Sequence, residues 1–227
     1  TLPRSMQTKE SNSVLFISDR KFTDYTIPGG VQVCTTEFIK YFEHAGYDLQ
    51  FLKVSPTQKF FKKLKIKLGL EVYDRYDFEH YKNEILELVR RHNIKVIALN
   101  QLNLSPLVEI LRPHLDQYVK FVGLSHGNES GDYIHDIMEN RKPTFLETWR
   151  LGKFLTYESH LFKNLLDGVI IISEHESSIN AWLGAQNIQL LPRFLSSAKI
   201  DWHPQGQTIG FVGTLDHLPN YKGIELL

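Results

Sequence analysis

Short runs of apolar residues alternate along this chain with segments in which apolar residues recur at helical spacing. The runs fall at residues 14–17, 48–54, 95–99, 118–125, 169–173 and 188–191. Unbroken apolar runs of this length are typical of strands that are covered on both faces, as in parallel sheets. The alternation therefore predicts an α/β fold, with a Rossmann-like open parallel sheet and helices on both of its faces.

Capping residues mark several of the predicted helices. The first helix is expected to end at Gly46, because glycine is favoured just after the last helical turn. Ser105 followed by Pro106 predicts an N-cap and a first helical residue. Thr144 with Glu147 predicts a capping box at the start of a later helix.

The composition is that of an ordinary globular protein. Of the 227 residues, 42% are hydrophobic and 23% are charged. Lys and Arg together number 26, and so do Asp and Glu, so no overall basic charge points to nucleic acid as a partner.

Cysteine content and hydropathy indicate the compartment. Cys34 is the only cysteine and falls on the apolar side of the first predicted helix, where a buried thiol is expected. A single cysteine excludes an intramolecular disulfide and favours a reducing compartment. No apolar run is long enough to span a membrane, and the polar residues 1–11 contain no signal-peptide core. We therefore expect a cytoplasmic protein, and the absence of an initial Met indicates a processed or engineered start.

A basic segment over residues 59–70 stands apart from this neutral background. It carries five lysines and no acid, and its apolar residues Phe60, Phe61, Leu64 and Leu68 fall near one helical face. The lysines are Lys59, Lys62, Lys63, Lys65 and Lys67. One interpretation is peripheral contact with the anionic inner face of a membrane. The other is a solvated surface helix, neutralised by the neighbouring acids Glu71, Asp74, Asp77 and Glu79.

Three loops follow predicted strands and compete for the ligand-binding edge of the sheet, where parallel strands end. They cover residues 19–30, 126–131 and 173–174. The first ends in Gly29 and Gly30, directly before a helix. A helix N-terminus with glycines attracts phosphate or carboxylate, but the same pair also suits a simple tight turn. The chain has neither a dinucleotide-binding glycine fingerprint nor a Walker loop.

The last part of the chain predicts a second domain. Residues 193–207 have no clear period and contain Ser, Pro and Gly, as linkers do. Residues 208–213 then begin a new strand, and residues 219–220 open a new helix. We expect an N-terminal domain over residues 1–192, an interdomain linker over 193–207 and the incomplete beginning of a donor-binding domain over 208–227.

Four segments, in order, resemble the N-terminal half of a GT-B glycosyltransferase, most of all the retaining glycosyltransferase family 4. They are Pro28-Gly-Gly-Val-Gln32, Ser125-His-Gly-Asn128, Asp167-Gly-Val-Ile-Ile-Ile-Ser173, and Ile209-Gly-Phe-Val-Gly213 with Lys222-Gly223. The resemblance covers nearly the whole chain. It implies two Rossmann-like domains facing each other across a cleft, of which this chain supplies the acceptor side.

The resemblance also implies an activity. A hexosyl group would pass from a nucleotide diphosphate sugar to a glycan or lipid-linked acceptor, with retention of configuration and without a metal or other cofactor. Activity would need the C-terminal domain. His126 matches a histidine beside the transferred sugar and is the expected catalytic residue. The expected donor- and acceptor-binding residues are Gly29, Gly30, Val31, Gly127, Asn128, Glu129, Ser173, Glu174, Gly213 and Lys222. Thr214 stands where the family usually has an arginine, which weakens that part of the phosphate clamp.

Elementary chemistry agrees with these expectations. Helix N-termini, a lysine and backbone N–H groups stabilise a leaving phosphate without a metal. The chain has no D-x-D, and its ten histidines are scattered rather than clustered at ligand spacing. His126 suits a hydrogen bond to a sugar or acceptor hydroxyl, or a proton transfer. Glu129 is a candidate for orienting His126 or the acceptor, whereas Glu174 suits the first turn of a helix. Trp149, Trp182 and Trp202 are expected to be packing residues.

Two other functions remain open on the sequence. One is a non-catalytic Rossmann-like binding or scaffold module, and the other is a GT-B nucleotide-sugar epimerase. Expected partners are a nucleotide-sugar donor, a glycan or lipid-linked acceptor and a membrane surface, with no nucleic acid. A reading frame continuing past Leu227 by a further domain length favours the transferase, and a chain ending there favours the binding module.

Overall fold

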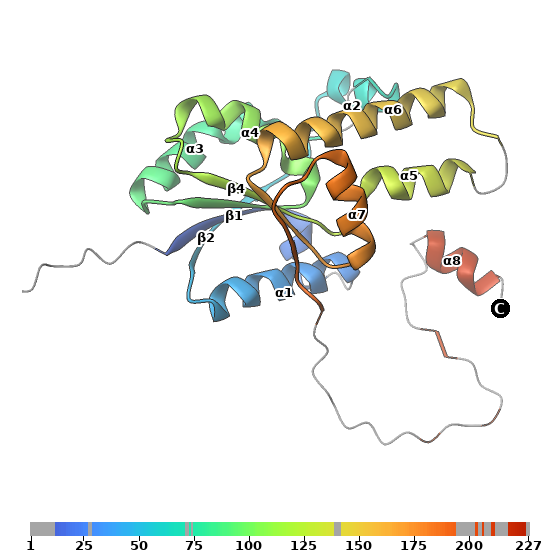
Figure 1. Cartoon of the computed structure of the whole chain (residues 1–227), viewed down its shortest axis with the longest axis horizontal. Coiled ribbons are helices and arrows are strands. Elements are labelled where there is room, and N and C mark those ends of the chain that lie inside the picture. Colours follow the sequence, from blue (N-terminus) through green and yellow to red (C-terminus); the bar gives the residue numbers. More distant parts are fainter. Residues whose placement is uncertain are drawn as a thin grey trace, which may run out of the picture.

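The fold is a six-stranded parallel sheet between helices, as the apolar runs predict (Figure 1). The computed structural model describes residues 12–26, 29–70, 73, 75–138, 142–193, 203, 206, 210–211 and 218–225. The strands are β1 (Ser13–Asp19), β2 (Asp48–Val54), β3 (Val96–Asn100), β4 (Lys120–Leu124), β5 (Gly168–Ile171) and β6 (Ile188–Leu190). Every neighbouring pair is parallel, so the predicted class of open parallel sheet is confirmed.

The strand order is β2-β1-β3-β4-β5-β6, so the chain changes direction across the sheet between β1 and β3. In open α/β sheets, ligands bind outside the carboxyl ends of the strands at such a switch point. Two polar residues lie there side by side, because Ser18 of β1 pairs in register with Asn100 of β3. The topology alone therefore makes this edge the first place to look for a site.

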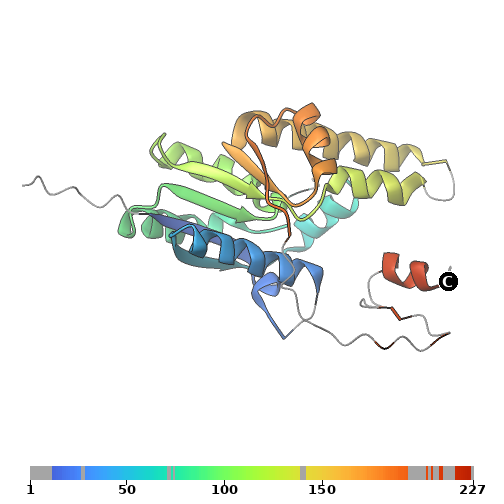
Figure 2. The ribbon, with the colours of Figure 1, turned by 60° about the horizontal axis from the view of Figure 1, so that its bottom comes forward.

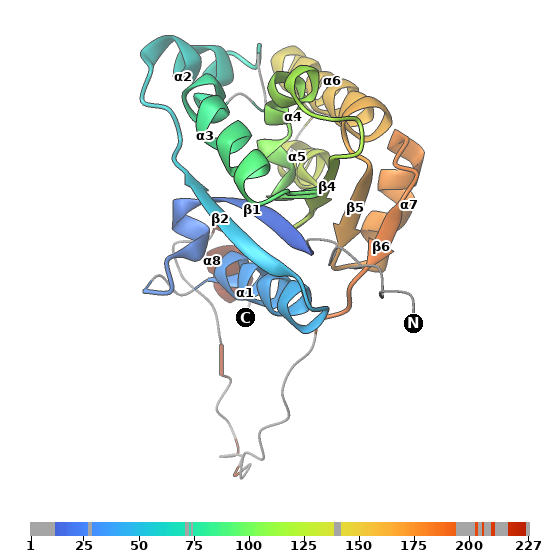
Figure 3. The same cartoon turned by 90° about the vertical axis from the view of Figure 1, so that its left-hand side faces the viewer.

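The helices cover both faces of the sheet (Figure 3). α1 (Gly30–His44) packs on one face, where Val14 and Phe16 meet Cys34 and Phe38. The larger core lies on the other face, which carries Leu15 and Ile17. There the sheet packs against α3 (Phe78–Arg91), α4 (Pro106–Leu111) and the π-helical turn η4 (Leu161–Leu165). Alternate residues of β1 thus face opposite cores, as the two-residue period of a strand requires.

The remaining helices surround this centre. They are α2 (Phe60–Lys67), α5 (Glu129–Met138), α6 (Phe145–His160), α7 (Glu174–Leu183) and α8 (Leu218–Glu225), with short 3-10 turns η1 (Arg20–Thr23), η2 (Leu102–Leu104) and η3 (Arg112–His114). Figure 2 shows α5 and α6 lying side by side and extending beyond the sheet. The loop between β4 and β5 therefore projects as a helical hairpin rather than covering the sheet edge.

Helix ends test the predicted caps. The capping box of Thr144 and Glu147 is present in both directions, and Gly46 follows α1 with a φ of +83°. Ser105 and Pro106 are the N-cap and first residue of α4, as predicted, but the expected side-chain capping bond of Ser105 is missing. Its side chain donates instead to the carbonyl of Leu102. The cause is that Ser105 already has helical dihedrals (φ −64°, ψ −23°), because α4 continues directly from the turn η2.

Two of the predicted packing tryptophans are exposed. Trp149 on α6 is 48% exposed and Trp182 on α7 is 74% exposed, so neither belongs to the core. Helical periodicity places both on outward faces, which residue type alone does not reveal. Trp202 lies outside the described residues, and so do most of residues 194–217, including Gly213 and the strand predicted at residues 208–213. The helix predicted from residue 219 is present as α8.

Candidate functional site

A pocket of about 470 Å³ opens at the carboxyl edge of the sheet, beside the switch point. It brings together two segments that the sequence singled out, the glycine loop before α1 and the loop after β4. Residues predicted for the site that line it are Gly29, Gly30, Val31 and His126, and they are joined by Gln32, Cys34, Ile172, Arg193 and Asn220. The pocket is therefore built from the N-terminal part of α1, the segments that follow β4, β5 and β6, and α8.

The N-terminus of α1 faces this pocket without a side-chain cap. Gly29 is the N-cap residue, has extended backbone (φ −178°, ψ 156°) and lacks a side chain that accepts from the first turn. No acidic residue lies in that turn, so the positive end of the helix dipole is not compensated locally. A methyl group at Gly30 meets no atom within 4 Å, so packing does not require glycine there. Open N–H groups and free space are what an anion needs at a helix N-terminus.

His126 is held by an amide from the neighbouring strand end. Its Nε2 lies 2.7 Å from Oδ1 of Asn100, the last residue of β3. Asn100 is fully buried and its Nδ2 donates to Oγ of Ser18 at 2.8 Å and to Oγ1 of Thr35 at 2.9 Å. Phe38 packs edge-on against the imidazole, with ring centroids 5.5 Å apart. The ring is thus fixed by β1, β3 and α1 together.

The direction of these hydrogen bonds determines the tautomer of His126. Ser18 donates its hydroxyl to the carbonyl of Asp19 at 3.1 Å, so its oxygen accepts from the Nδ2 side of Asn100. The carbonyl oxygen of Asn100 then faces the imidazole, and Nε2 must donate to it. The other ring nitrogen, Nδ1, is buried and has no hydrogen-bond partner within the described structure. The neutral ring therefore carries its lone pair on Nδ1.

Burial, and to a smaller extent the positive charge of Arg193, lowers the pKa of His126 from 6.5 to about 4. The cause is physical: a charged imidazolium loses hydration in the pocket and gains no counter-ion there. Arg193 itself pairs with Glu37, its Nε lying 2.9 Å from the carboxylate. His126 is consequently neutral at pH 7, and its buried Nδ1 is able to accept a hydrogen bond but not to donate one.

The loop that carries His126 is anchored from its other side by Glu176. Ser125 donates to Oε2 of this buried glutamate of α7 at 2.5 Å. Gly127 has a φ of +151°, in the region that favours glycine, and its N–H donates to Oγ of Ser125 at 3.3 Å. Burial raises the pKa of Glu176, and the bond from Ser125 opposes this rise. Gly127 thus serves the turn of the loop.

Asn128 and Glu129 lie at the start of α5 rather than in the pocket lining. Asn128 is buried and accepts from the N–H of Gly131 at 2.6 Å, as a helix N-cap does. Burial raises the pKa of Glu129, with Arg75 opposing this rise and Asp132 adding to it. The contact that orients His126 comes from the amide of Asn100 rather than from Glu129, and a role of Glu129 toward the acceptor stays a prediction.

A buried carboxyl lies behind α5. Glu158 of α6 is fully buried and accepts from the hydroxyl of Tyr73 at 2.7 Å and from the N–H of Ser130 at 3.1 Å, both at Oε1. Its Oε2 has no hydrogen-bond partner among the described atoms. Burial raises the pKa of Glu158, and these two hydrogen bonds oppose the rise. This carboxyl ties α5 and α6 to the segment around Tyr73.

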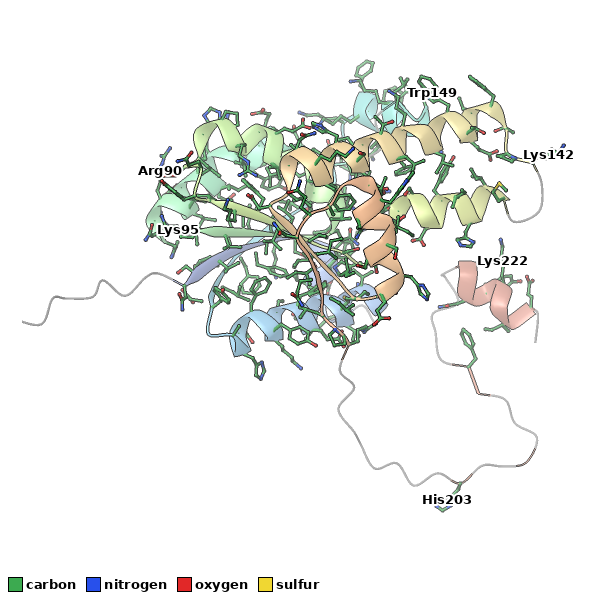
Figure 4. The ribbon with its side chains drawn as sticks, viewed as in Figure 1. Arg90, Lys95, Lys142, Trp149, His203 and Lys222 are labelled. Carbon is green, nitrogen blue, oxygen red and sulfur yellow. The ribbon has the colours of Figure 1, made fainter. Side chains whose placement is uncertain are left out.

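The remaining predicted site residues are more scattered. Ser173 precedes α7 and makes no side-chain cap, and Glu174 is exposed in the first turn, as its helix-dipole interpretation predicts. Lys222 lies on α8 and is partly buried, and Asn220 of that helix reaches the pocket. Figure 4 shows Lys222 on α8. Gly213 lies outside the described residues.

The lysines of α2 are partly engaged by the protein. Lys59 pairs with Asp77 at 2.5 Å, Lys62 donates to the carbonyl of Tyr76 at 2.9 Å, and Lys63 donates to Gln58 at 2.5 Å. Lys65 is exposed and Lys67 is the last residue of α2. Asp77 therefore neutralises one lysine as predicted, whereas Glu71 and Asp74 lie outside the described residues. The apolar side chains Phe60 and Phe61 of α2 are not buried against the protein, since they are 71% and 77% exposed.

Three residues of the site escape prediction from motifs: Asn100, Ser18 and Glu176. Asn100 and Ser18 each follow an apolar run, and a polar residue at a strand end is the signal that would have found them. Glu176 shares a helical face with Asn180 and Leu183, so the period of α7 predicts its burial.

The described residues contain neither a metal-binding group nor a membrane-spanning helix. Within the described part of the chain, no three His, Cys, Asp or Glu side chains gather as a metal-binding group. Across the same residues, no helix combines the length and the apolar character needed to cross a bilayer. Comparison of the chain with protein-family models, with curated proteins and with solved structures finds no match.

Proposed function

We propose that this chain is the acceptor-side domain of a glycosyltransferase with the GT-B architecture. It would take part in hexosyl transfer from a nucleotide diphosphate sugar to a glycan or lipid-linked acceptor. The observation that carries the proposal is one pocket at the β1/β3 switch point that holds both the open N-terminus of α1 and the neutral ring of His126. The sheet order and the position of the pocket support ligand binding at this edge.

Each part of the pocket has a task in such a transfer. The leaving group is an anion, and the N–H groups of the first turn of α1 stabilise negative charge without a metal. Nδ1 of His126 carries the lone pair that would accept a hydrogen bond from a hydroxyl of the sugar or acceptor, once a shift of the ring or its neighbours exposes this buried atom. Arg193 adds positive charge at the pocket wall, although its pairing with Glu37 offsets part of that charge. Most donor contacts are assigned to the second domain that the sequence resemblance implies.

Peripheral contact with the inner face of a membrane is the second part of the proposal. Its support is the surface of α2, where Phe60, Phe61 and Leu64 are exposed. The same helix contains lysines and no acidic residue. Exposed apolar groups flanked by cations are typical of helices that lie on anionic bilayers. A lipid-linked acceptor would then be met at the membrane surface.

A binding experiment tests the pocket directly. Uridine, guanosine and adenosine diphosphate hexoses are titrated by calorimetry into this chain and into the natural protein that contains it. We expect binding to the natural protein, with Gly30→Asp weakening it at least about tenfold and Gly30→Ala leaving it unchanged. A methyl group fits the open space at Gly30, whereas a carboxylate repels the phosphates. If no nucleotide sugar binds the natural protein, the transferase proposal fails and a non-catalytic binding module takes its place.

A further inference from the structure

Helices α2, α3, α4 and α6 lie on the face of the sheet opposite α1 (Figures 1 and 3). Residues of these four helices line a second cavity. Its volume is about 670 Å³, and it shares no lining residue with the pocket at the carboxyl edge. Phe78, Ile110, Tyr73, Tyr157 and Leu70 form much of its wall. Tyr73 and Phe78 are buried, so the wall of the cavity belongs to the protein core. Both the size and the apolar wall are typical of small-molecule sites.

Both acidic and basic side chains line the cavity, and some of them are paired with other residues. Of its acids, Asp77 pairs with Lys59 at 2.5 Å, whereas Glu79 is exposed in the first turn of α3. Glu109 lies 3.2 Å from Nε2 of His160, which compensates its charge only when the ring is protonated. Two lysines also line the cavity. Lys62 is held by its bond to the carbonyl of Tyr76, and the ammonium of Lys153 lies 5.3 Å from the ring centre of Trp149. Two positioned lysines therefore lie beside the apolar residues of a cavity that also holds three acids, of which Asp77 is already paired with Lys59.

Two helices that line the cavity, α2 and α6, also carry exposed apolar side chains. Phe60 and Phe61 on α2 are 71% and 77% exposed, and Phe145, Leu146 and Trp149 on α6 are 83%, 56% and 48% exposed. Figure 4 shows Trp149 on the outer side of α6, beside α2. Arg150 joins the two helices by donating to the carbonyl of Ile66 at 3.4 Å. We call these five exposed side chains the α2–α6 surface.

We propose that the cavity binds one hydrocarbon chain of an anionic lipid, with the lipid phosphate near Lys62 and Lys153. The inference rests on the membrane contact proposed above and adds a defined site to it. The α2–α6 surface would meet the bilayer, and a single chain would leave the bilayer and enter the cavity between α2 and α6. An apolar wall with two cations matches the two chemical parts of such a lipid, since aliphatic chains favour burial and a phosphate favours lysine.

The test uses myristoyl lysophosphatidylglycerol at concentrations where it is monomeric, so that no bilayer is present. Calorimetry and native mass spectrometry measure its binding to the full chain. We expect one bound lipid per chain, weaker binding of myristoyl lysophosphatidylcholine, and no binding of glycerophosphoglycerol, which lacks the chain. Equal binding of the chain-free headgroup, or no binding of the lysolipid, overturns the proposal.

A pair of matched variants locates the site. Thr156 lines the cavity and Thr148 does not, yet both are exposed on α6 and each donates its hydroxyl to a carbonyl four residues earlier. Thr156→Trp fills the cavity, so we expect at least about a tenfold loss of affinity, whereas Thr148→Trp retains wild-type affinity. Lys153→Glu is expected to weaken the anionic lysolipid selectively.

Vesicles separate this inference from the membrane proposal. Thr156→Trp should still bind vesicles of phosphatidylglycerol and phosphatidylcholine, because the α2–α6 surface is intact. If the wild-type chain binds vesicles but not the monomeric lysolipid, membrane contact stands and the lipid-chain site is wrong. If Thr156→Trp binds the lysolipid as tightly as the wild-type chain does, the lipid lies elsewhere and the proposal is likewise overturned.

Discussion

The imidazole of His126 and the side-chain amide of Asn100 are joined by a hydrogen bond of 2.7 Å at the carboxyl edge of the sheet. Asn100 donates both of its side-chain N–H groups, one to Ser18 and one to Thr35, so its Oδ1 can only accept from the ring. One buried amide on β3 therefore selects the tautomer of a histidine that follows β4. Neighbouring strands in a parallel sheet make this possible, since their polar end residues meet at one edge.

Replacing Asn100 by Asp should raise the pKa of His126. The wild-type ring has a pKa of about 4, because burial disfavours its charged form. A carboxylate in contact with Nε2 stabilises the imidazolium, so we expect a rise of about one unit or more. Nitrogen-15 NMR of the histidine rings measures both the pKa and the protonated nitrogen. An unprotonated Nε2 in the wild-type protein at pH 7 would contradict the inferred tautomer.

The same histidine should make stability depend on pH. The unfolded chain protonates His126 near pH 6.5, whereas the folded chain does so only near pH 4. The unfolded state thus binds more protons in this window, so the free energy of unfolding falls as the pH falls from 6.5 to 4. The slope from this one group approaches about 1.4 kcal/mol per pH unit.

Denaturant unfolding at several pH values checks this slope. His126→Gln removes the titrating group and should flatten the profile relative to the wild-type protein. The control is His114→Gln, because His114 is exposed in η3. Glu129, Glu158 and Glu176 have raised pKa values, so their contribution to the free energy of unfolding falls as the pH rises above 4.5. The difference between the two histidine variants cancels their contribution, and equal slopes would rule out the buried neutral ring.

Tyr73→Phe should destabilise the protein by about 1–3 kcal/mol, because the buried carboxyl of Glu158 loses a donor. The lost bond is 2.7 Å long and Glu158 has no exposed surface. Tyr118→Phe is the matched control, since Tyr118 is 66% exposed. Chemical denaturation at pH 7 measures both variants. Equal stability of the two would show that the hydroxyl of Tyr73 contributes nothing to holding α6.

Membrane contact predicts a charge effect confined to one surface. Lys63→Glu with Lys65→Glu should strongly reduce co-sedimentation with phosphatidylglycerol vesicles, and high salt should weaken wild-type binding. Lys40→Glu with Lys53→Glu makes the same change of net charge at exposed positions on α1 and β2, and should bind normally. A similar loss in both double variants would indicate a general charge effect and remove the assigned surface.

Hydrophobic patterning predicted the fold well, because each buried strand is a continuous apolar run and each strand end meets a common edge. It also placed Gly29, Gly30 and His126 at that edge, and the pocket joins them. The partner of His126 was not predicted, because Asn100 follows an apolar run without forming a motif. Its contact arises only when β3 and β4 lie side by side.

Exposure was harder to predict than secondary structure. Trp149 and Trp182 are bulky and apolar, which favours burial, but the helices that carry them leave these side chains exposed. Ser105 shows a related limit. It is the N-cap residue of α4 as predicted, yet the turn η2 already sets helical dihedrals there, and its side chain makes no capping bond.

Glycosyl transfer by the natural protein is the most direct measurement of the proposed function. Radiolabelled hexose transfer from nucleotide diphosphate sugars is followed for the wild-type protein, for His126→Ala and for the exposed control His114→Ala. We expect wild-type and control transfer to be equal, and His126→Ala to lower kcat at least about tenfold, the equivalent of about 1.4 kcal/mol in the transition state. The thermal midpoint of each variant shows whether it is folded. Full activity in a folded His126→Ala protein, or no transfer from any donor by the wild-type protein, would contradict the proposed site.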